Sequence, residues 1–124
     1  MFCLTAGALA ATLAVHSFTL TWIHSVEKTE IQEDYSQVGD RLVLTEARIK
    51  TSGAGFDPPP GATLDSGWWR WRPGTSLDAV TLARAAAPGD WHICVHNSCR
   101  SVSHYLPQAD HDTPIRITAC PIKP

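Results

Sequence analysis

The sequence predicts an all-β protein, a single-domain antiparallel β-sandwich or partly open barrel of about seven to nine short strands. Three observations support this fold class. The 124 residues suit one domain with one core. Nine prolines and eight glycines interrupt the chain too often for long helices. Short stretches that alternate apolar and polar residues recur along the chain, with the period of a strand.

The first 26 residues contain no Asp, Glu, Lys or Arg. A secretory leader would begin with basic residues, and a membrane span needs about 20 consecutive apolar residues, which His16 and Thr21 interrupt. Residues 18–23 alternate instead, as in a strand. We therefore expect residues 1–7 and 12–25 to form core strands, the second bent near residues 15–17, with no direct membrane span. A cleaved or anchoring leader is the alternative.

Downstream, residues 29–37 and 41–50 are separated by a Gly39-Asp40 pair, which is typical of a two-residue hairpin turn. Further strands are expected over 67–73, 78–85, 90–96, 98–106 and 114–120. Residues 51–66 are rich in Gly and Pro and predict a long loop, because three consecutive prolines do not fit a central strand. Residues 121–124 form a tail, and the whole chain, 1–124, is one β domain.

A candidate site follows from the register of that hairpin. A turn at residues 39–40 pairs Glu33 with Glu46 and Ile31 with Arg48 on one sheet face, and the preceding strand brings His24 beside them. Two facing carboxylates repel unless a cation or a proton intervenes, so Arg48 and His24 are the expected neutralising partners. Such a cluster can be a structural ion-pair network, a binding site or an acid–base pair.

The four cysteines leave three alternatives open. A two-residue turn at His96-Asn97 places Cys94 opposite Cys99 in a non-hydrogen-bonded pair, which is within disulfide range. Free thiols are the second alternative, and a zinc site with His92 and His96 is the third, although the spacing matches no familiar zinc motif. We favour the Cys94–Cys99 disulfide and no metal. No spacing rule decides whether Cys3 pairs with Cys120.

Three segments carry a resemblance to a known family: "FTLTWIHSVEKTEIQEDY", "LVLTEARIKTSGAGFDPPPG" and "GWWRWRP". Together they resemble the domain of unknown function 1850 family, over about residues 1–100. Members of that family are often encoded beside TAXI-type TRAP transporters, and many carry a leader or an anchor before the domain. The family pattern falls on His24, Ser25, Glu27, Lys28, Thr29, Glu33, Glu46, Arg48, Gly53 and Gly55, which are therefore the candidate binding or partner residues.

The net charge of −2 provides no basic field for nucleic acid, and no motif indicates a cofactor. We predict a non-enzymatic accessory or binding module, associated with a transporter or another membrane-protein partner, or with the cell envelope. The alternatives are a small hydrolase or acid–base enzyme that uses Glu33 or Glu46 with His24, and a structural envelope protein. The resemblance and the cysteines favour an extracytoplasmic or membrane-adjacent location.

Overall fold

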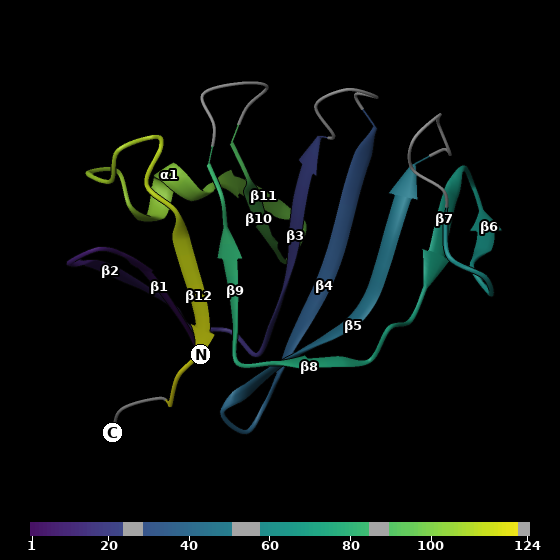
Figure 1. Cartoon of the computed structure of the whole chain (residues 1–124), viewed down its shortest axis with the longest axis horizontal. Helices are drawn as coiled ribbons and strands as arrows, with labels where there is room; N and C mark the ends of the chain where they lie inside the picture. The colour runs from purple at the N-terminus through teal and green to yellow at the C-terminus, as the bar shows by residue number, and fades with distance from the viewer. Residues whose placement is uncertain (24–28, 51–57, 85–89, 122–124) are drawn as a thin grey trace.

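The computed structural model describes residues 1–23, 29–50, 58–84 and 90–121, and over these ranges the chain forms twelve strands and one short helix. The strands build two antiparallel sheets (Figure 1), which confirms the predicted all-β class. The elements are β1 (Phe2–Ala6), β2 (Leu9–Leu13), β3 (Ser17–Ile23), β4 (Glu30–Val38), β5 (Arg41–Lys50), β6 (Thr63–Asp65), β7 (Trp68–Trp71), β8 (Thr75–Leu77), β9 (Ala79–Leu82), β10 (His92–Val95), β11 (Ser98–Ser101), α1 (Val102–Tyr105) and β12 (Ile115–Ala119).

The smaller sheet has the strand order β2-β1-β12-β9, and the larger sheet has the order β11-β10-β3-β4-β5-β7-β6, with β8 paired to β5. We call the side of the larger sheet that carries Phe18, Leu20 and Tyr35 its inner face, and the side that carries Thr19 and Asp34 its outer face. The core lies against the inner face.

Alternation of apolar and polar residues positions this core. In β1, Phe2 and Leu4 are fully buried, and the Phe2 ring meets the Phe18 ring of β3 edge-on with 4.7 Å between centroids. Phe18 in turn stacks on Tyr35 of β4 at 5.5 Å. Because aromatic side chains bury large apolar areas, this series of contacts fixes the smaller sheet against β3 and β4.

β1 lies within residues 1–7, as expected. The second expected strand, 12–25, is not one bent strand: residues 12–13 end β2 of the smaller sheet, residues 17–23 form β3 of the larger sheet, and residues 24–25 lie outside the described ranges. The hairpin between β1 and β2 was not expected; it turns at Gly7, whose φ of +60° suits glycine. Within the described ranges, no helix has the length and apolar character to cross a membrane.

The predicted β4–β5 hairpin is present. Val38 pairs with Arg41 around a turn in which Gly39 has a φ of +63°, and Tyr35 faces Leu44 as expected. Beyond that pair the register shifts, so that Asp34 faces Glu46 and the extra residue, Thr45, forms a β-bulge. The Thr45 hydroxyl donates a hydrogen bond to the Asp34 carbonyl oxygen at 3.2 Å.

Two local predictions were wrong. Residues 63–65, inside the predicted loop, form β6 and pair with β7. Residues 102–105, inside a predicted strand, form α1, because the Ser101 hydroxyl accepts a hydrogen bond from the Ser103 N–H and caps the helix. Residues 51–57 of the predicted loop and 122–124 of the predicted tail lie outside the described ranges.

Two disulfides cross-link the chain. Cys94 and Cys99 are bonded across the β10–β11 hairpin with 3.9 Å between their Cα atoms, which confirms the predicted bridge and its turn at residues 96–97. Cys3 of β1 is bonded to Cys120, just after β12, and this bridge connects residues near the two ends of the chain. The long loop that it closes makes it the stronger constraint on the unfolded chain.

Candidate functional site

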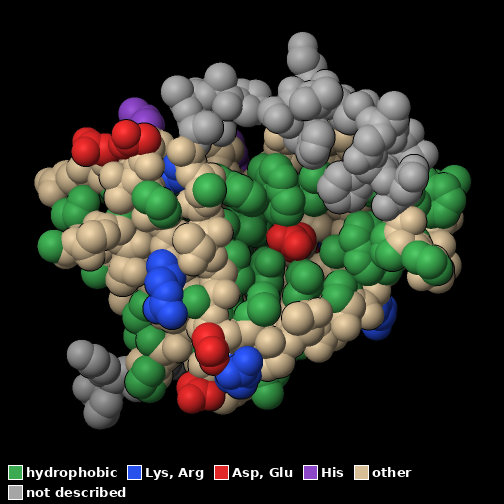
Figure 2. Space-filling model, viewed as in Figure 1, with side chains coloured by type: hydrophobic (Ala, Val, Ile, Leu, Met, Phe, Trp, Pro, Cys, Tyr) green, Lys and Arg blue, Asp and Glu red, His purple; other side chains and the backbone are tan. Residues whose placement is uncertain are grey.

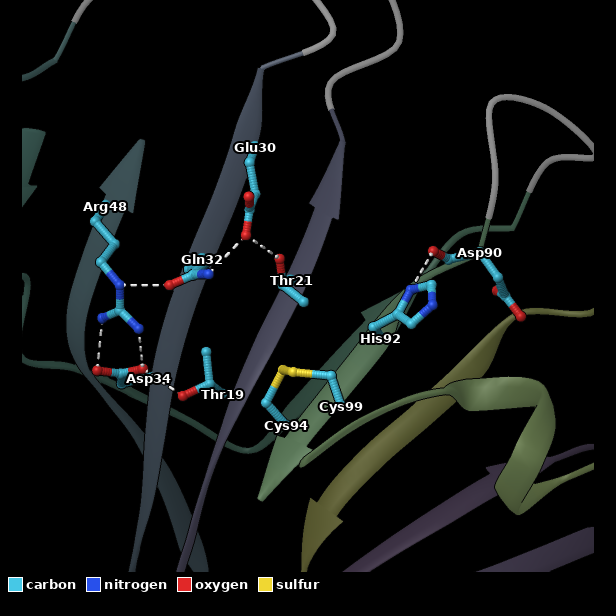
Figure 3. The surroundings of a disulfide bond; sticks show 10 residues. All are labelled: Thr19, Thr21, Glu30, Gln32, Asp34, Arg48, Asp90, His92, Cys94 and Cys99. Carbon is cyan, nitrogen blue, oxygen red and sulfur yellow. Dashed lines mark hydrogen bonds and ion pairs between the residues drawn. A yellow bond between two sulfur atoms is a disulfide. The ribbon is translucent and has the colours of Figure 1, made fainter. Parts of the chain in front are cut away.

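The outer face of the larger sheet carries a row of polar side chains from β3, β4 and β5 (Figure 3). Residues two apart on a strand point to the same side, so Gln32 and Asp34 project together from β4. Thr19 of β3 pairs with Asp34, and Arg48 of β5 pairs with Gln32. The register therefore gathers one anion, one cation and their hydrogen-bonding neighbours.

Arg48 holds Asp34 in a two-point contact. Its Nη1 lies 2.8 Å from Asp34 Oδ2 and its Nη2 lies 3.1 Å from Asp34 Oδ1. Its Nε donates to Gln32 Oε1 at 2.6 Å, and the Thr19 hydroxyl donates to Asp34 Oδ1 at 2.6 Å. The Arg48 side chain is only 13% exposed, so this is a well-packed, charge-assisted contact rather than a solvated surface pair.

Burial alone would raise the pKa of Asp34, but the hydrogen bonds from Arg48 and Thr19 and the nearby guanidinium charges outweigh burial and lower that pKa. Asp34 is therefore a carboxylate at neutral pH. Because its charge is matched by Arg48, the pair presents little net charge to a ligand.

The outer face carries further polar and charged side chains on both sides of the Asp34–Arg48 pair. Gln32 Nε2 donates to Glu30 Oε2 at 2.7 Å, which extends the network along β4. On β5, Glu46 accepts a hydrogen bond from Arg70 Nη1 of β7 at 3.0 Å and lies 3.8 Å from Arg48 Nη1. Acids and bases thus alternate across the sheet, as in a structural ion-pair network.

An open groove lies over this face and encloses about 570 Å³. One side is formed by β3, β4 and the Thr45 bulge, and the other by the β10–β11 hairpin. The disulfide of that hairpin lies beside Thr19 (Figure 3). The volume is within the range of ligand sites, but the lining is mostly polar. Its hydrogen-bonding side chains include Ser17, Thr19, Ser36, Thr45, His96 and Asn97.

The cysteines beside the groove are not metal ligands, because Cys94 and Cys99 are bonded to each other. His92 lies on the same hairpin, and its Nδ1 is 3.1 Å from the Asp90 carbonyl oxygen. Among the described residues, no three His, Cys, Asp or Glu side chains are grouped to hold a metal ion.

Glu33 does not join this cluster, and the register predicted for it was wrong. The bulge at Thr45 shifts the pairing by one residue, so Glu33 faces Ala47 rather than Glu46, and Ile31 faces Ile49 rather than Arg48. Neighbouring residues of a strand point to opposite sides. Glu33 therefore lies on the inner face, whereas Glu46 and Arg48 lie on the outer face.

On the inner face Glu33 has apolar neighbours. Its cross-strand partners are Leu20 and Ala47, both buried, and its carboxylate accepts a hydrogen bond from the Tyr35 hydroxyl at 3.0 Å. Figure 2, which views this side, shows hydrophobic side chains gathered around an acidic group in the region of β4. Burial raises the pKa of Glu33, and the Tyr35 hydrogen bond offsets only part of that effect. Burial and the Glu33 charge raise the pKa of Tyr35 in turn.

This arrangement limits the possible chemistry. Glu33 and Glu46 are on opposite sides of the sheet, so they do not face one substrate as an acid–base pair. Neither residue lines the outer groove, whose carboxylate is that of Asp34. A groove with paired charges and several hydroxyl and amide groups is suited to binding through hydrogen bonds.

The other candidate binding or partner residues named from the sequence stay predictions. Thr29 is half-buried just before β4. The following residues lie outside the described ranges: His24, Ser25, Glu27, Lys28, Gly53 and Gly55.

Sequence reasoning missed Asp34, Gln32 and Thr19 as members of the cluster. A signal for them exists in β5, where the apolar residues that pack in the core change from even numbers, Leu42 and the partly buried Leu44, to odd numbers, Ala47 and Ile49. Such a phase change indicates a bulge, and a bulge places Asp34 opposite Glu46.

Comparison with known proteins agrees with the resemblance in the sequence. Residues 18–102 match the family described as Domain of unknown function (DUF1850). This segment begins in β3 and ends at the start of α1, so it contains the polar row, the bulge and the β10–β11 hairpin. No curated protein and no solved structure matches the chain significantly. Because the match covers more than half of the 124 residues, the chain belongs to the DUF1850 family.

Proposed function

We propose that this protein is a non-enzymatic accessory module that binds a polar segment of a membrane-protein partner, in the manner of a transporter-associated or cell-envelope component. The observation that carries the proposal is the open groove of about 570 Å³ on the outer face of the larger sheet. Its lining combines donors and acceptors, such as Ser17, Ser36 and Asn97, with the neutral Asp34–Arg48 pair.

The character of the groove favours a protein segment over a small apolar ligand. Small-molecule sites are mostly apolar and enclose their ligand, whereas this groove is open and mostly polar. Interfaces between proteins accept polar surface and trapped water. With Asp34 and Arg48 already paired, affinity would come from hydrogen bonds and shape rather than from a single charge.

The two disulfides support an oxidising compartment, because structural disulfides persist outside the cytoplasm and are rare within it. An extracytoplasmic or membrane-adjacent location is therefore part of the proposal. The family resemblance suggests a TRAP-type transporter as the partner.

A substitution that fills the groove tests this function. Ser17 is exposed at the groove, so Ser17→Trp should leave the fold intact and block access. Thr63→Trp is the matched control, because Thr63 is also exposed, on β6 of the same sheet, but does not line the groove. Each tagged protein is incubated with the detergent-solubilised native membrane fraction, and captured proteins are quantified by mass spectrometry.

We expect an integral membrane protein to be captured by the wild type and by Thr63→Trp, and to be lost with Ser17→Trp. Equal capture by all three proteins, with unchanged circular dichroism, would contradict binding in the groove. Capture of no membrane protein by the wild type would contradict the accessory function itself.

A further inference from the structure

The smaller sheet ends in an unusually unprotected strand. Within the described residues, β2 has β1 as its only strand partner, so its other edge is open (Figure 1). Open edges pair readily with other strands, and proteins commonly block them with charges, prolines or very short strands. β2 has five residues, Leu9-Ala-Ala-Thr-Leu13, without a charge or a proline.

The other ends of the two sheets are better protected. β6 has only three residues and includes Asp65, while β11 includes Arg100. β9 has four residues and directly follows Asp78, whose side chain is 82% exposed. Each of these ends therefore has the charge or the shortness that discourages pairing, and β2 has neither.

The backbone of β2 presents a defined set of hydrogen-bonding groups at this edge. Ala6 and Leu9 flank the two-residue turn, so they form the hydrogen-bonded pair next to it. Hydrogen-bonded pairs alternate along an antiparallel ladder, so Leu9, Ala11 and Leu13 direct their N–H and C=O groups toward β1. Ala10 and Thr12 direct theirs outward.

We propose that β2 pairs antiparallel with β2 of a second copy of this chain, across a two-fold axis at Ala11. In this register Ala10 faces Thr12 of the second copy, and Thr12 faces its Ala10. These are the residues whose backbone groups point outward, so the pairing forms four hydrogen bonds without breaking any within a protomer.

The side chains fit the same register. Leu9 faces Leu13 of the second copy on the side that carries the core residues, where Leu13 is buried and Leu9 is half-buried. Ala10 and Thr12 meet on the solvent side, where both are exposed. The apolar side of one small sheet thus continues into that of the other.

A second copy suits this edge better than an unrelated peptide does. β2 offers no charge that would select a charged partner, whereas its sequence matches itself around Ala11, with a leucine at each end. A two-fold contact requires such self-complementarity, since each surface meets its own copy. The result is a dimer in which two four-stranded sheets join at their β2 edges.

Proline at an outward-facing position tests the proposal. Ala10→Pro removes an outward N–H, which no bond inside the protomer uses, and edge strands tolerate proline. Multi-angle light scattering of the full chain is measured over about a hundredfold range of concentration, because dimers dissociate on dilution. We expect the wild type to approach twice 13.5 kDa at high concentration, and Ala10→Pro to stay at 13.5 kDa.

Thr12→Val is the control, because it keeps the backbone N–H and the strand preference of residue 12, and it should dimerise like the wild type. Amide hydrogen exchange provides a second measurement that does not depend on a variant. The Ala10 and Thr12 amides should exchange at least tenfold more slowly at high protein concentration, while that of Ala11, bonded to β1, should change little. A wild type that stays monomeric at every concentration, with fast exchange at both positions, would overturn the proposal.

Discussion

Glu33 and Asp34 are consecutive residues of β4, and the sheet separates them into two different environments. Asp34 lies on the outer face, where Arg48 and Thr19 donate hydrogen bonds to it. Glu33 lies on the inner face, between Leu20 and Ala47, and receives one hydrogen bond from Tyr35. The pKa of Asp34 is lowered and that of Glu33 is raised.

The difference shows what decides the state of a carboxylate in this fold. Burial disfavours the charged form of both residues, so burial alone does not distinguish them. The neighbouring side chains do: the Arg48 guanidinium, which reaches Asp34 from the adjacent strand, opposes the effect of burial, whereas the Ala47 methyl group opposite Glu33 cannot do so. A polar network therefore stabilises one face, and apolar packing stabilises the other.

The largest effect is expected from the inner face. Leu20 is 1% exposed and packs beside Glu33. Leu20→Ala removes buried methyl groups and leaves a cavity, so it should lower the free energy of unfolding by about 2–5 kcal/mol. Urea denaturation followed by tryptophan fluorescence measures this loss.

Thr21, the next residue of β3, lies on the outer face and provides the matched control. Its hydroxyl makes one long hydrogen bond, 3.4 Å to Glu30 Oε2. Thr21→Ala should cost less than about 1 kcal/mol. If Leu20→Ala and Thr21→Ala lower the free energy of unfolding equally, the two faces contribute equally to stability and the difference between them is contradicted.

An intermediate effect is expected from the outer face. Arg48→Met leaves the Asp34 carboxylate with Thr19 but without its guanidinium, and should cost about 1–3 kcal/mol at neutral pH. The loss should depend on pH. The lowered pKa of Asp34 means that its contribution to stability is present above the unfolded value, about 3.9, and is lost as pH falls through the folded value. The difference between wild type and variant should therefore shrink in acid.

Urea denaturation at several pH values measures this dependence. Arg41→Met is the control, because the Arg41–Asp78 pair is largely exposed, with side chains 43% and 82% accessible. Solvent screens such a pair, so its loss should be under about 1 kcal/mol. If the cost of Arg48→Met is the same at pH 3 and pH 7, its pairing with Asp34 is not what stabilises the outer face.

The sequence predicted much of the fold from local patterns. Alternation in residues 18–23 predicted a core strand, the Gly39-Asp40 pair predicted a hairpin, and the spacing of Cys94 and Cys99 predicted a disulfide, all of which are present. These features depend on interactions between residues close in sequence. They could therefore be inferred without knowing how the sheets pack.

The candidate site was predicted less well, because it depends on one extra residue. Pairing counted outward from the turn is correct as far as Leu44, and the Thr45 bulge then reverses which residues share a face. One bulge was enough to replace Glu33 by Asp34 as the partner of the outer-face residues Glu46 and Arg48. The apolar residues of β5 carried the signal, since their spacing changes between Leu44 and Ala47.

The smallest change in stability is expected when the same substitution, glutamate to glutamine, is made on each face of the sheet. This pair of variants compares the two faces most directly. Glu33→Gln keeps an oxygen that can accept the Tyr35 hydrogen bond but removes a charge from apolar surroundings. It should raise the free energy of unfolding at pH 7, by an amount on the order of 1 kcal/mol or less. Glu46→Gln removes the ion pair with Arg70 on the outer face and should lower the free energy of unfolding by a similar amount.

The pH profile separates the charge of Glu33 from its packing. Because its pKa is raised, the contribution of Glu33 is fully present below the unfolded value, about 4.3, and is lost as pH rises through the folded value. The free energy of unfolding of Glu33→Gln should therefore increasingly exceed that of the wild type as pH rises from 4 to 8. Below pH 4 the two proteins should be equally stable. Urea denaturation across this range measures the profile. A loss of stability at pH 7 would mean that the Glu33 carboxylate has a stabilising partner, and the inner face would then resemble the outer one.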